Sequence, residues 1–198
     1  MLLLGILALI QTIFLPGILI LYFANIKTQS IIQKYIYIFA LSLFANYSLV
    51  TILVLLKIYV FAAMFSIIAV EILLFVFLFT KKRIINYDVL NQNELYKYPK
   101  ALFAQNTIVV KTLIISSLTI ILFYFSLLIA NIGTIFYFTD TVNNIHWNTW
   151  ALDFANNILP IQSSHFPQLI PTNWSISYLL LGGSNIHFFP KSIMPLFF

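Results

Sequence analysis

The side chains best suited to chemistry gather in one stretch of this chain, DTVNNIHWNTWALDF at 140–154. It holds two of the five acidic residues, one of the three histidines and two of the three tryptophans. A carboxylate such as that of Asp140 can act as a general base that takes a proton from a hydroxyl group. Tryptophans also anchor helices at the membrane–water interface. The stretch therefore has two interpretations, a catalytic loop or a helix on a membrane surface.

A helical wheel over residues 145–159 favours the surface helix for most of the stretch. Its polar side chains share one narrow stripe, and apolar side chains fill most of the remaining circumference, with Asn148 as the exception. The stripe consists of His146, Thr149, Asp153, Asn156 and Asn157. This pattern predicts an amphipathic helix in the outer interface, with its tryptophans at head-group depth and Asp140 as a cap.

Spacing argues against a local metal site in this stretch. His146 and Asp153 are seven residues apart, which is about 10 Å along a helix and too far for one ion to bind both. A site that combines Asp140 with residues from elsewhere remains open. The chain has no cysteine, which excludes disulfides, iron–sulfur clusters and thiolate metal sites. No P-loop, nucleophile-elbow or zinc-protease pattern is present either.

The composition of the chain indicates an integral membrane protein. Of the 198 residues, 62% are hydrophobic and only 8% are charged, whereas roughly a quarter of a soluble domain is charged. The net charge is +5, but the basic residues flank apolar runs and form no patch. Charges placed in this way orient helices in a bilayer. We therefore expect a lipid bilayer as partner and no nucleic acid.

Apolar runs long enough to span a bilayer predict an all-α fold with about four transmembrane helices. Three of them occupy residues 1–80, over 2–24, 35–56 and 59–80, with a kink at Pro16 and Gly17. A basic connection covers 81–111, and the fourth helix covers 112–139. Residues 140–198 then form an extracytoplasmic segment with interfacial amphipathic helices, broken by prolines and expected to be truncated.

The basic residues predict the orientation of these helices. The connections after the first and third spans hold eight of the ten basic residues, which places both in the cytoplasm. The N-terminus and residues 140–198 then lie on the outer face. We expect a bacterial inner membrane as the location within the cell envelope.

Glu71 lies in the middle of the third predicted span, FSIIAVEILLFVF. An ionisable group at bilayer depth costs a few kcal/mol and is a candidate functional residue. The alternative is a protonated carboxyl group that donates a hydrogen bond to a neighbouring helix. The sequence leaves both open.

The stretch DTVNNIHWNTWALDFANNILPIQSSHFPQLIPTNWSISYLLLG resembles the first outer loop of bacterial GT-C-type membrane glycosyltransferases. The group includes the protein mannosyltransferase-like and lipid-A arabinosyltransferase-like enzymes, and the resemblance covers about 108–198. It implies transfer of a sugar from a polyprenyl-phosphate donor to a lipid, glycan or protein on the outer face. Asp140 matches the loop acid, which implies a general base or part of a metal and phosphate site. A divalent metal ion is an implied cofactor of the complete enzyme. Trp147, Trp150 and Trp174 are implied contacts for the sugar or prenyl chain, with anchoring at the membrane interface as the alternative role for each.

The chain departs from this family in two respects. Thr141 follows Asp140 where many relatives have a second acid, and such enzymes usually have many more spans. We therefore expect a fragment or degenerate copy, inactive alone, with its site completed by a second chain. One alternative is a non-catalytic small subunit of a respiratory or transporter complex, in which Glu71 matters and Asp140 does not. Another is a truncated reading frame without a function of its own.

Overall fold

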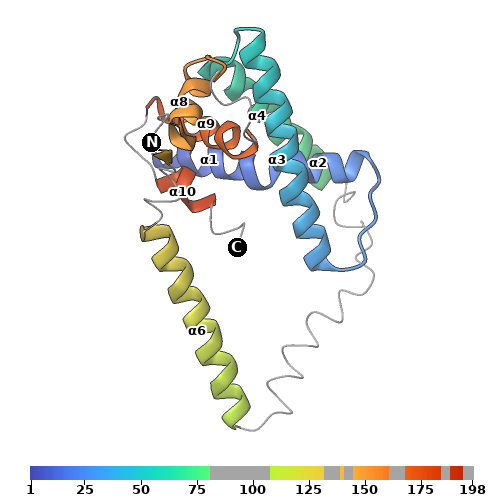
Figure 1. Cartoon of the computed structure of the whole chain (residues 1–198). Helices are drawn as coiled ribbons and strands as arrows, with labels where there is room; N and C mark the ends of the chain where they lie inside the picture. The colour runs from blue at the N-terminus through green and yellow to red at the C-terminus, as the bar shows by residue number, and fades with distance from the viewer. Residues whose placement is uncertain (81–107, 132–138, 141–144, 161–167, 184–187, 194–198) are drawn as a thin grey trace.

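The described elements of this chain are helices, apart from one short pair of strands. The computed structural model describes residues 1–80, 108–131, 139–140, 145–160, 168–183 and 188–193 (Figure 1). The helices are α1 (Leu2–Ile13), α2 (Leu15–Phe23), α3 (Ile31–Leu55), α4 (Phe61–Thr80), α6 (Ile108–Asn131), α8 (Trp147–Ala155), α9 (Leu169–Leu181) and α10 (Phe188–Ile193). The strands are β1 (Thr139–Asp140) and β2 (Ile145–His146), which pair antiparallel.

Three of the described helical segments are long and apolar enough to cross a membrane: α1 with α2, α3, and α4. They coincide with the three N-terminal spans that the sequence predicts, so three apolar helices of spanning length are confirmed in this part of the chain. The α3 helix starts four residues before its predicted start at 35. Ser30 caps it, because its hydroxyl oxygen accepts a hydrogen bond from the Gln33 amide at 3.1 Å.

The kink predicted in the first span is present, and it lies at Phe14, where α1 ends and α2 begins. Phe14 has φ −133° and ψ −50°, outside helical geometry. Pro16 explains the break, because its ring carries no N–H for the Thr12 carbonyl and crowds the preceding turn. A proline in the first turn of α2 costs nothing, since that N–H has no helical partner.

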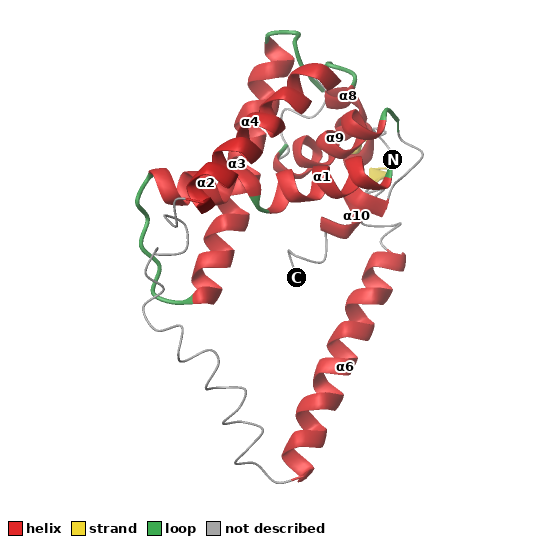
Figure 2. Ribbon diagram, turned by 180° about the vertical axis from the view of Figure 1, so that it is seen from behind, coloured by secondary structure: helices red, strands yellow, loops and turns green. Residues whose placement is uncertain are grey.

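The fourth predicted span is described in part. The α6 helix covers 112–131 of it, and 132–138 lie outside the described residues, as do 81–107 of the basic connection. Figures 1 and 2 show α6 projecting away from the other helices, with α10 the nearest to it. A count of four spans therefore stays a prediction.

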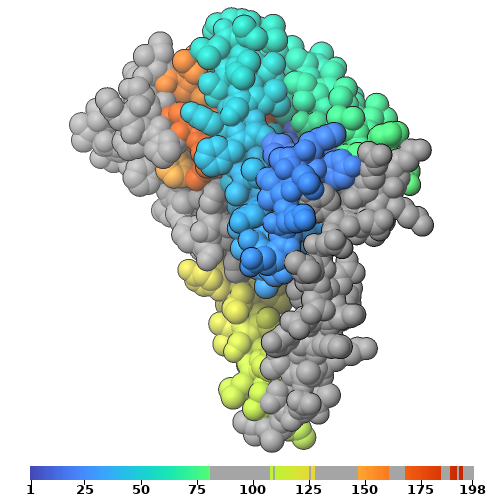
Figure 3. All heavy atoms as spheres, turned by 90° about the vertical axis from the view of Figure 1, so that its right-hand side faces the viewer, coloured from blue at the N-terminus to red at the C-terminus, as the bar shows by residue number. Residues whose placement is uncertain are grey.

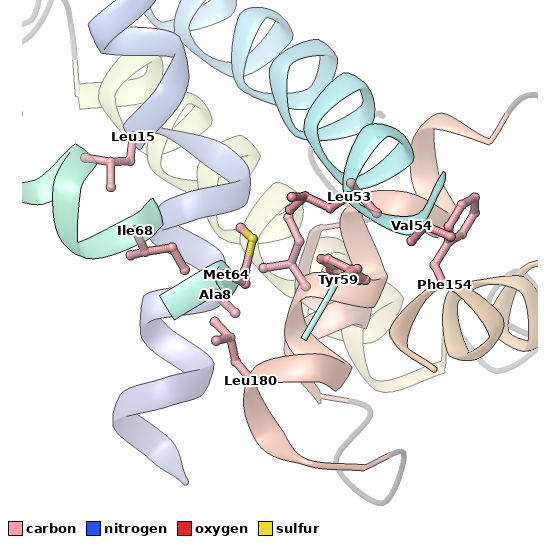
Figure 4. Packing of buried hydrophobic residues seen from close by; sticks show 11 residues of the cluster. Ala8, Leu15, Leu53, Val54, Tyr59, Met64, Ile68, Phe154 and Leu180 are labelled. Atoms are coloured by element: carbon pink, nitrogen blue, oxygen red, sulfur yellow. The ribbon is translucent and has the colours of Figure 1, made fainter. Parts of the chain in front are cut away.

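The core of the molecule forms around α9, which packs against α1, α3, α4, α8 and α10. One large cluster joins Ala8, Met64 and Leu180 from three different helices, and Figure 4 shows these side chains turned toward one another. A second cluster joins Ala151, Trp174, Tyr178 and Ile193. In Figure 3, the atoms of α3 lie between those of α8 and α9 (orange) and those of α4 (green).

A glycine allows close helix contact in two places. A Cβ atom on Gly17 would lie 1.9 Å from the Ile38 carbonyl oxygen, so only glycine lets α2 approach α3 here. The Gly17 amide also donates to the Ser42 hydroxyl oxygen at 2.9 Å. A Cβ atom on Gly5 would lie 2.1 Å from the Phe189 ring, which brings α10 against α1.

Candidate functional site

The main chain around Asp140 forms a small hairpin that leads into α8. Asp140 in β1 is paired with Ile145 in β2, and Thr139 with His146. The α8 helix begins at Trp147, directly after β2. The predicted cap is therefore wrong, because β2 separates Asp140 from the helix terminus. The pairing instead holds the main chain of Asp140 beside Ile145, two residues before α8 begins.

The α8 helix is shorter than the predicted 145–159, because β2 takes its first residues and Asn157 ends it. Asn157 has φ 62°, and the next amide, that of Ile158, returns to the Asp153 carbonyl oxygen at 2.8 Å. This left-handed turn is a Schellman motif. The ends of α2 and α3 show the same arrangement, with Asn25 and Lys57 at the left-handed position.

The predicted apolar face of α8 exists, but it packs against protein. Trp150, Ala151 and Phe154 are buried, whereas Thr149 on the polar stripe is exposed. The partner of this face is α9. Asn148, the exception on the wheel, is buried, and its side-chain oxygen accepts a hydrogen bond from the Tyr178 hydroxyl of α9. The helix is amphipathic because it covers a neighbouring helix.

Asp153 lies half-buried on the polar stripe of α8. Burial disfavours its charged form and raises the pKa of its carboxyl group above the ordinary value.

The three tryptophans occupy different environments. Trp174 is 0% exposed and Trp150 is 3% exposed, so protein packing encloses both side chains. Trp147 is half-buried, and its ring centroid lies 6.4 Å from that of Trp174, tilted by 58°. The reason is α9, which brings Trp174 into the centre of the bundle. Of the three, Trp147 alone keeps an appreciable exposed portion for the implied sugar contact, which stays a prediction.

Hydrogen bonds tie α8 and α9 to the turn between α3 and α4. The Tyr59 hydroxyl lies 3.0 Å from the Ser175 hydroxyl, and the Lys57 ammonium group donates to the Asn157 carbonyl at 3.1 Å. The Asn173 amide donates to the Leu43 carbonyl at 3.1 Å. Burial raises the pKa of the Tyr59 phenol, which keeps it a neutral hydrogen-bonding group. The first two contacts fix one end of the α3–α4 pair against α8 and α9, and the third joins α9 to the middle of α3.

Glu71 has a polar environment provided by two other spanning segments. The Gln11 side chain of α1 lies near the Glu71 carboxyl group. Gln11 Nε2 also donates to Asn46 Oδ1 at 3.1 Å, and Asn46 Nδ2 donates to the Gln11 carbonyl oxygen at 3.1 Å. Gln11 and Asn46 are fully buried, and Glu71 is half-buried. We call these three residues the mid-span cluster.

The structure therefore separates the two groups that the sequence proposes for function. Asp140 belongs to the hairpin before α8, and Glu71 belongs to the mid-span cluster. Gln11 and Asn46 were missed from the sequence, although an isolated amide inside an apolar run is itself a signal of an intramembrane contact. The described residues contain no group of three or more histidines and acids that could hold a metal ion.

The described fold defines the class of this protein as a helical membrane protein with three candidate spans. Comparison with protein-family models, with curated proteins and with solved structures finds no match. The resemblance to GT-C enzymes therefore rests on the residues quoted for it.

Proposed function

We propose that this chain is part of a GT-C-type membrane glycosyltransferase that uses a polyprenyl-phosphate sugar on the outer face. One observation carries the proposal: the β1–β2 pairing holds Asp140 next to the start of α8, and α8 packs on α9. The acid that the resemblance singles out is thus attached to a packed framework. Such attachment favours catalysis, because a general base must be held in a defined position.

The expected orientation also has support. Lys57 and Tyr59, in the turn between two spanning segments, contact Asn157 and Ser175. These contacts favour a location of α8 and α9 at the same membrane face as that turn. The distribution of basic residues assigns this turn to the outer face.

In the proposed reaction Asp140 takes the proton of an acceptor hydroxyl group. The hydroxyl oxygen forms a new bond to the anomeric carbon of the sugar. The bond from that carbon to the donor phosphate breaks, and polyprenyl phosphate leaves with the electron pair. We expect a second chain to supply the rest of the donor site, and no step is assigned to a metal ion.

Complementation in the source organism tests this proposal. Cells that lack the chain should lose a sugar from a surface glycan or lipid, measured by mass spectrometry, and the wild-type gene should restore it. Asp140→Asn should reduce this restoration by about 10²-fold, the usual contribution of a general base. Asp153→Asn, which removes another acid of the same segment, should restore it fully.

Two results would count against the proposal: unchanged surface sugars in the deletion, or full restoration by Asp140→Asn. The purified chain alone should transfer no sugar from a polyprenyl-phosphate donor. Robust transfer by it would contradict the expectation that a second chain is needed.

The mid-span cluster favours a second candidate, a non-catalytic subunit of a membrane complex. This candidate predicts that Glu71→Ala removes function and that Asp140→Ala preserves it. The glycosyltransferase proposal predicts the reverse. The two substitutions in the same complementation assay therefore separate the candidates.

A further inference from the structure

Three polar side chains lie near the middle of three candidate spans. Gln11 lies in the 2–23 span, Asn46 in α3 and Glu71 in α4. A position near the centre of each span places all three near the bilayer midplane. There, a polar or charged group needs partners within the protein.

Apolar side chains enclose this mid-span cluster along each helix. Three residues before and four residues after each member, the spanning segment carries a buried or half-buried apolar residue. These residues are Ala8 and Leu15 for Gln11, Leu43 and Val50 for Asn46, and Ile68 and Phe75 for Glu71. The cluster is thus a polar layer within an apolar core.

Two acceptor oxygens of the mid-span cluster receive no hydrogen bond from the described residues. Gln11 Nε2 donates a hydrogen bond to Asn46 Oδ1, and Asn46 Nδ2 donates one to the Gln11 carbonyl oxygen. Gln11 Oε1 and Glu71 Oε2 are buried and meet no donor among the described residues. Two acceptor oxygens on neighbouring side chains are costly in a core unless a positive or donating group lies with them.

Within the described helices that surround α4, charged groups that could neutralise Glu71 are distant. The helices around α4, which are α1, α2, α3 and α9, carry one charged side chain, that of Lys34. Lys34 is twelve residues before Asn46, or about 18 Å along α3. The N-terminal ammonium group lies at the start of α1, away from Gln11. The tyrosines of these helices are Tyr22, Tyr35, Tyr37, Tyr47 and Tyr178.

We propose that Glu71 and Gln11 form an intramembrane site for a small cation, either a sodium ion or a proton. Carboxylate and amide oxygens are suitable ligands for a hard cation. Either cation would neutralise the carboxylate, and a proton on Glu71 would donate to an acceptor such as Gln11 Oε1. The inference is independent of sugar transfer, because it uses none of the residues of the hairpin or of α8.

Thermal unfolding of the full chain in detergent tests the site. Sodium chloride and choline chloride are compared at equal ionic strength and at several pH values, for wild type, Glu71→Gln and the control Asp153→Asn. For a sodium site, sodium at roughly ten times its Kd raises the Tm of wild type by about 3–6 °C. Glu71→Gln loses this rise, and Asp153→Asn keeps it.

For a proton site, sodium has no effect, and the infrared spectrum shows a protonated carboxyl band that is absent from Glu71→Gln. The proposal is overturned when wild type and Glu71→Gln respond alike to sodium and neither spectrum contains a band that depends on Glu71.

A second measurement needs no variant, in case Glu71→Gln fails to fold. A hydrophobic carbodiimide reacts with protonated carboxyl groups in apolar surroundings, and mass spectrometry of wild type locates the adduct. Labelling of Glu71 that sodium prevents indicates a sodium site, and labelling that sodium leaves unchanged indicates a proton site. Absence of labelling together with absence of a sodium effect on Tm overturns the proposal.

Discussion

The helices α6 and α9 reverse the relation between polarity and burial that soluble proteins show. The exposed side chains of α6 that the structure describes are almost all apolar or carry a small hydroxyl group. Phe123, for example, is 64% exposed. In contrast, α9 carries asparagine, serine, threonine and tyrosine, yet nearly all of it is buried. We expect this difference to follow from the solvent, if lipid surrounds α6 as the predicted fourth span. In lipid, apolar side chains face outward, and polar groups find partners inside the protein.

The largest expected loss in the free energy of unfolding comes from a substitution at the centre of α9. Replacing Trp174 by alanine removes a fully buried indole and leaves a cavity. We expect a loss of about 3–5 kcal/mol in the free energy of unfolding. The matched control is Phe123→Ala on α6, which should change it by about 0.5 kcal/mol or less. Chemical denaturation in detergent measures both, and equal losses would contradict the comparison.

The second effect tests whether α6 faces lipid. Leu122 is 67% exposed on α6, so Leu122→Lys places a charge in the apolar surroundings expected there. We expect an insertion cost of about 2.5–3.5 kcal/mol. Thr149→Lys on the exposed side of α8 should insert like wild type. Membrane-integration assays of the two variants measure this, and normal integration of Leu122→Lys would show that water reaches α6.

The third effect concerns the polar groups of α9. Asn173 donates to the carbonyls of Leu43 and Leu169, at 3.1 and 2.7 Å. Asn173→Leu leaves the Leu43 carbonyl without this donor, and we expect a loss of about 1–3 kcal/mol. Ser126→Ala on α6 removes a hydroxyl that bonds only within its own helix, and it should change stability by about 0.5 kcal/mol or less. Denaturation midpoints compare the pair. A loss from Ser126→Ala as large as that from Asn173→Leu would be inconsistent with a buried polar α9.

The smallest effect is the pH dependence of Asp153, on the helix that covers α9. Burial raises the pKa of Asp153 in the folded chain above its value in the unfolded chain. The free energy of unfolding therefore falls as the pH rises from the unfolded-state pKa through the folded-state pKa. Asp153→Asn avoids this loss. The variant should be more stable at neutral pH by about 0.5 kcal/mol or less, and the difference should vanish at acidic pH. Unfolding as a function of pH measures it, and a constant difference would contradict this origin.

The three N-terminal spans could be predicted because continuous apolar runs and Pro16 are local signals. The buried position of α9 could not, because its serines, threonine and asparagine have the composition of a surface segment. Their burial depends on Tyr59 and Leu43, which are more than a hundred residues away. The apolar face of α8 was predicted from its periodicity, whereas its partner was not, since periodicity does not distinguish lipid from protein. The β1–β2 pairing was missed because two-residue strands have no sequence period.

Tryptophan fluorescence in bilayers that contain brominated lipid tests the comparison of α6 and α9 most directly. All three tryptophans lie in α8 and α9, so wild-type emission reports these two helices and contains no signal from α6. Brominated acyl chains should quench wild-type emission weakly, and Phe123→Trp should add a strongly quenched component from α6. Strong quenching of wild type, or an added tryptophan at 123 that escapes quenching, would contradict an α9 enclosed by protein and an α6 surrounded by lipid.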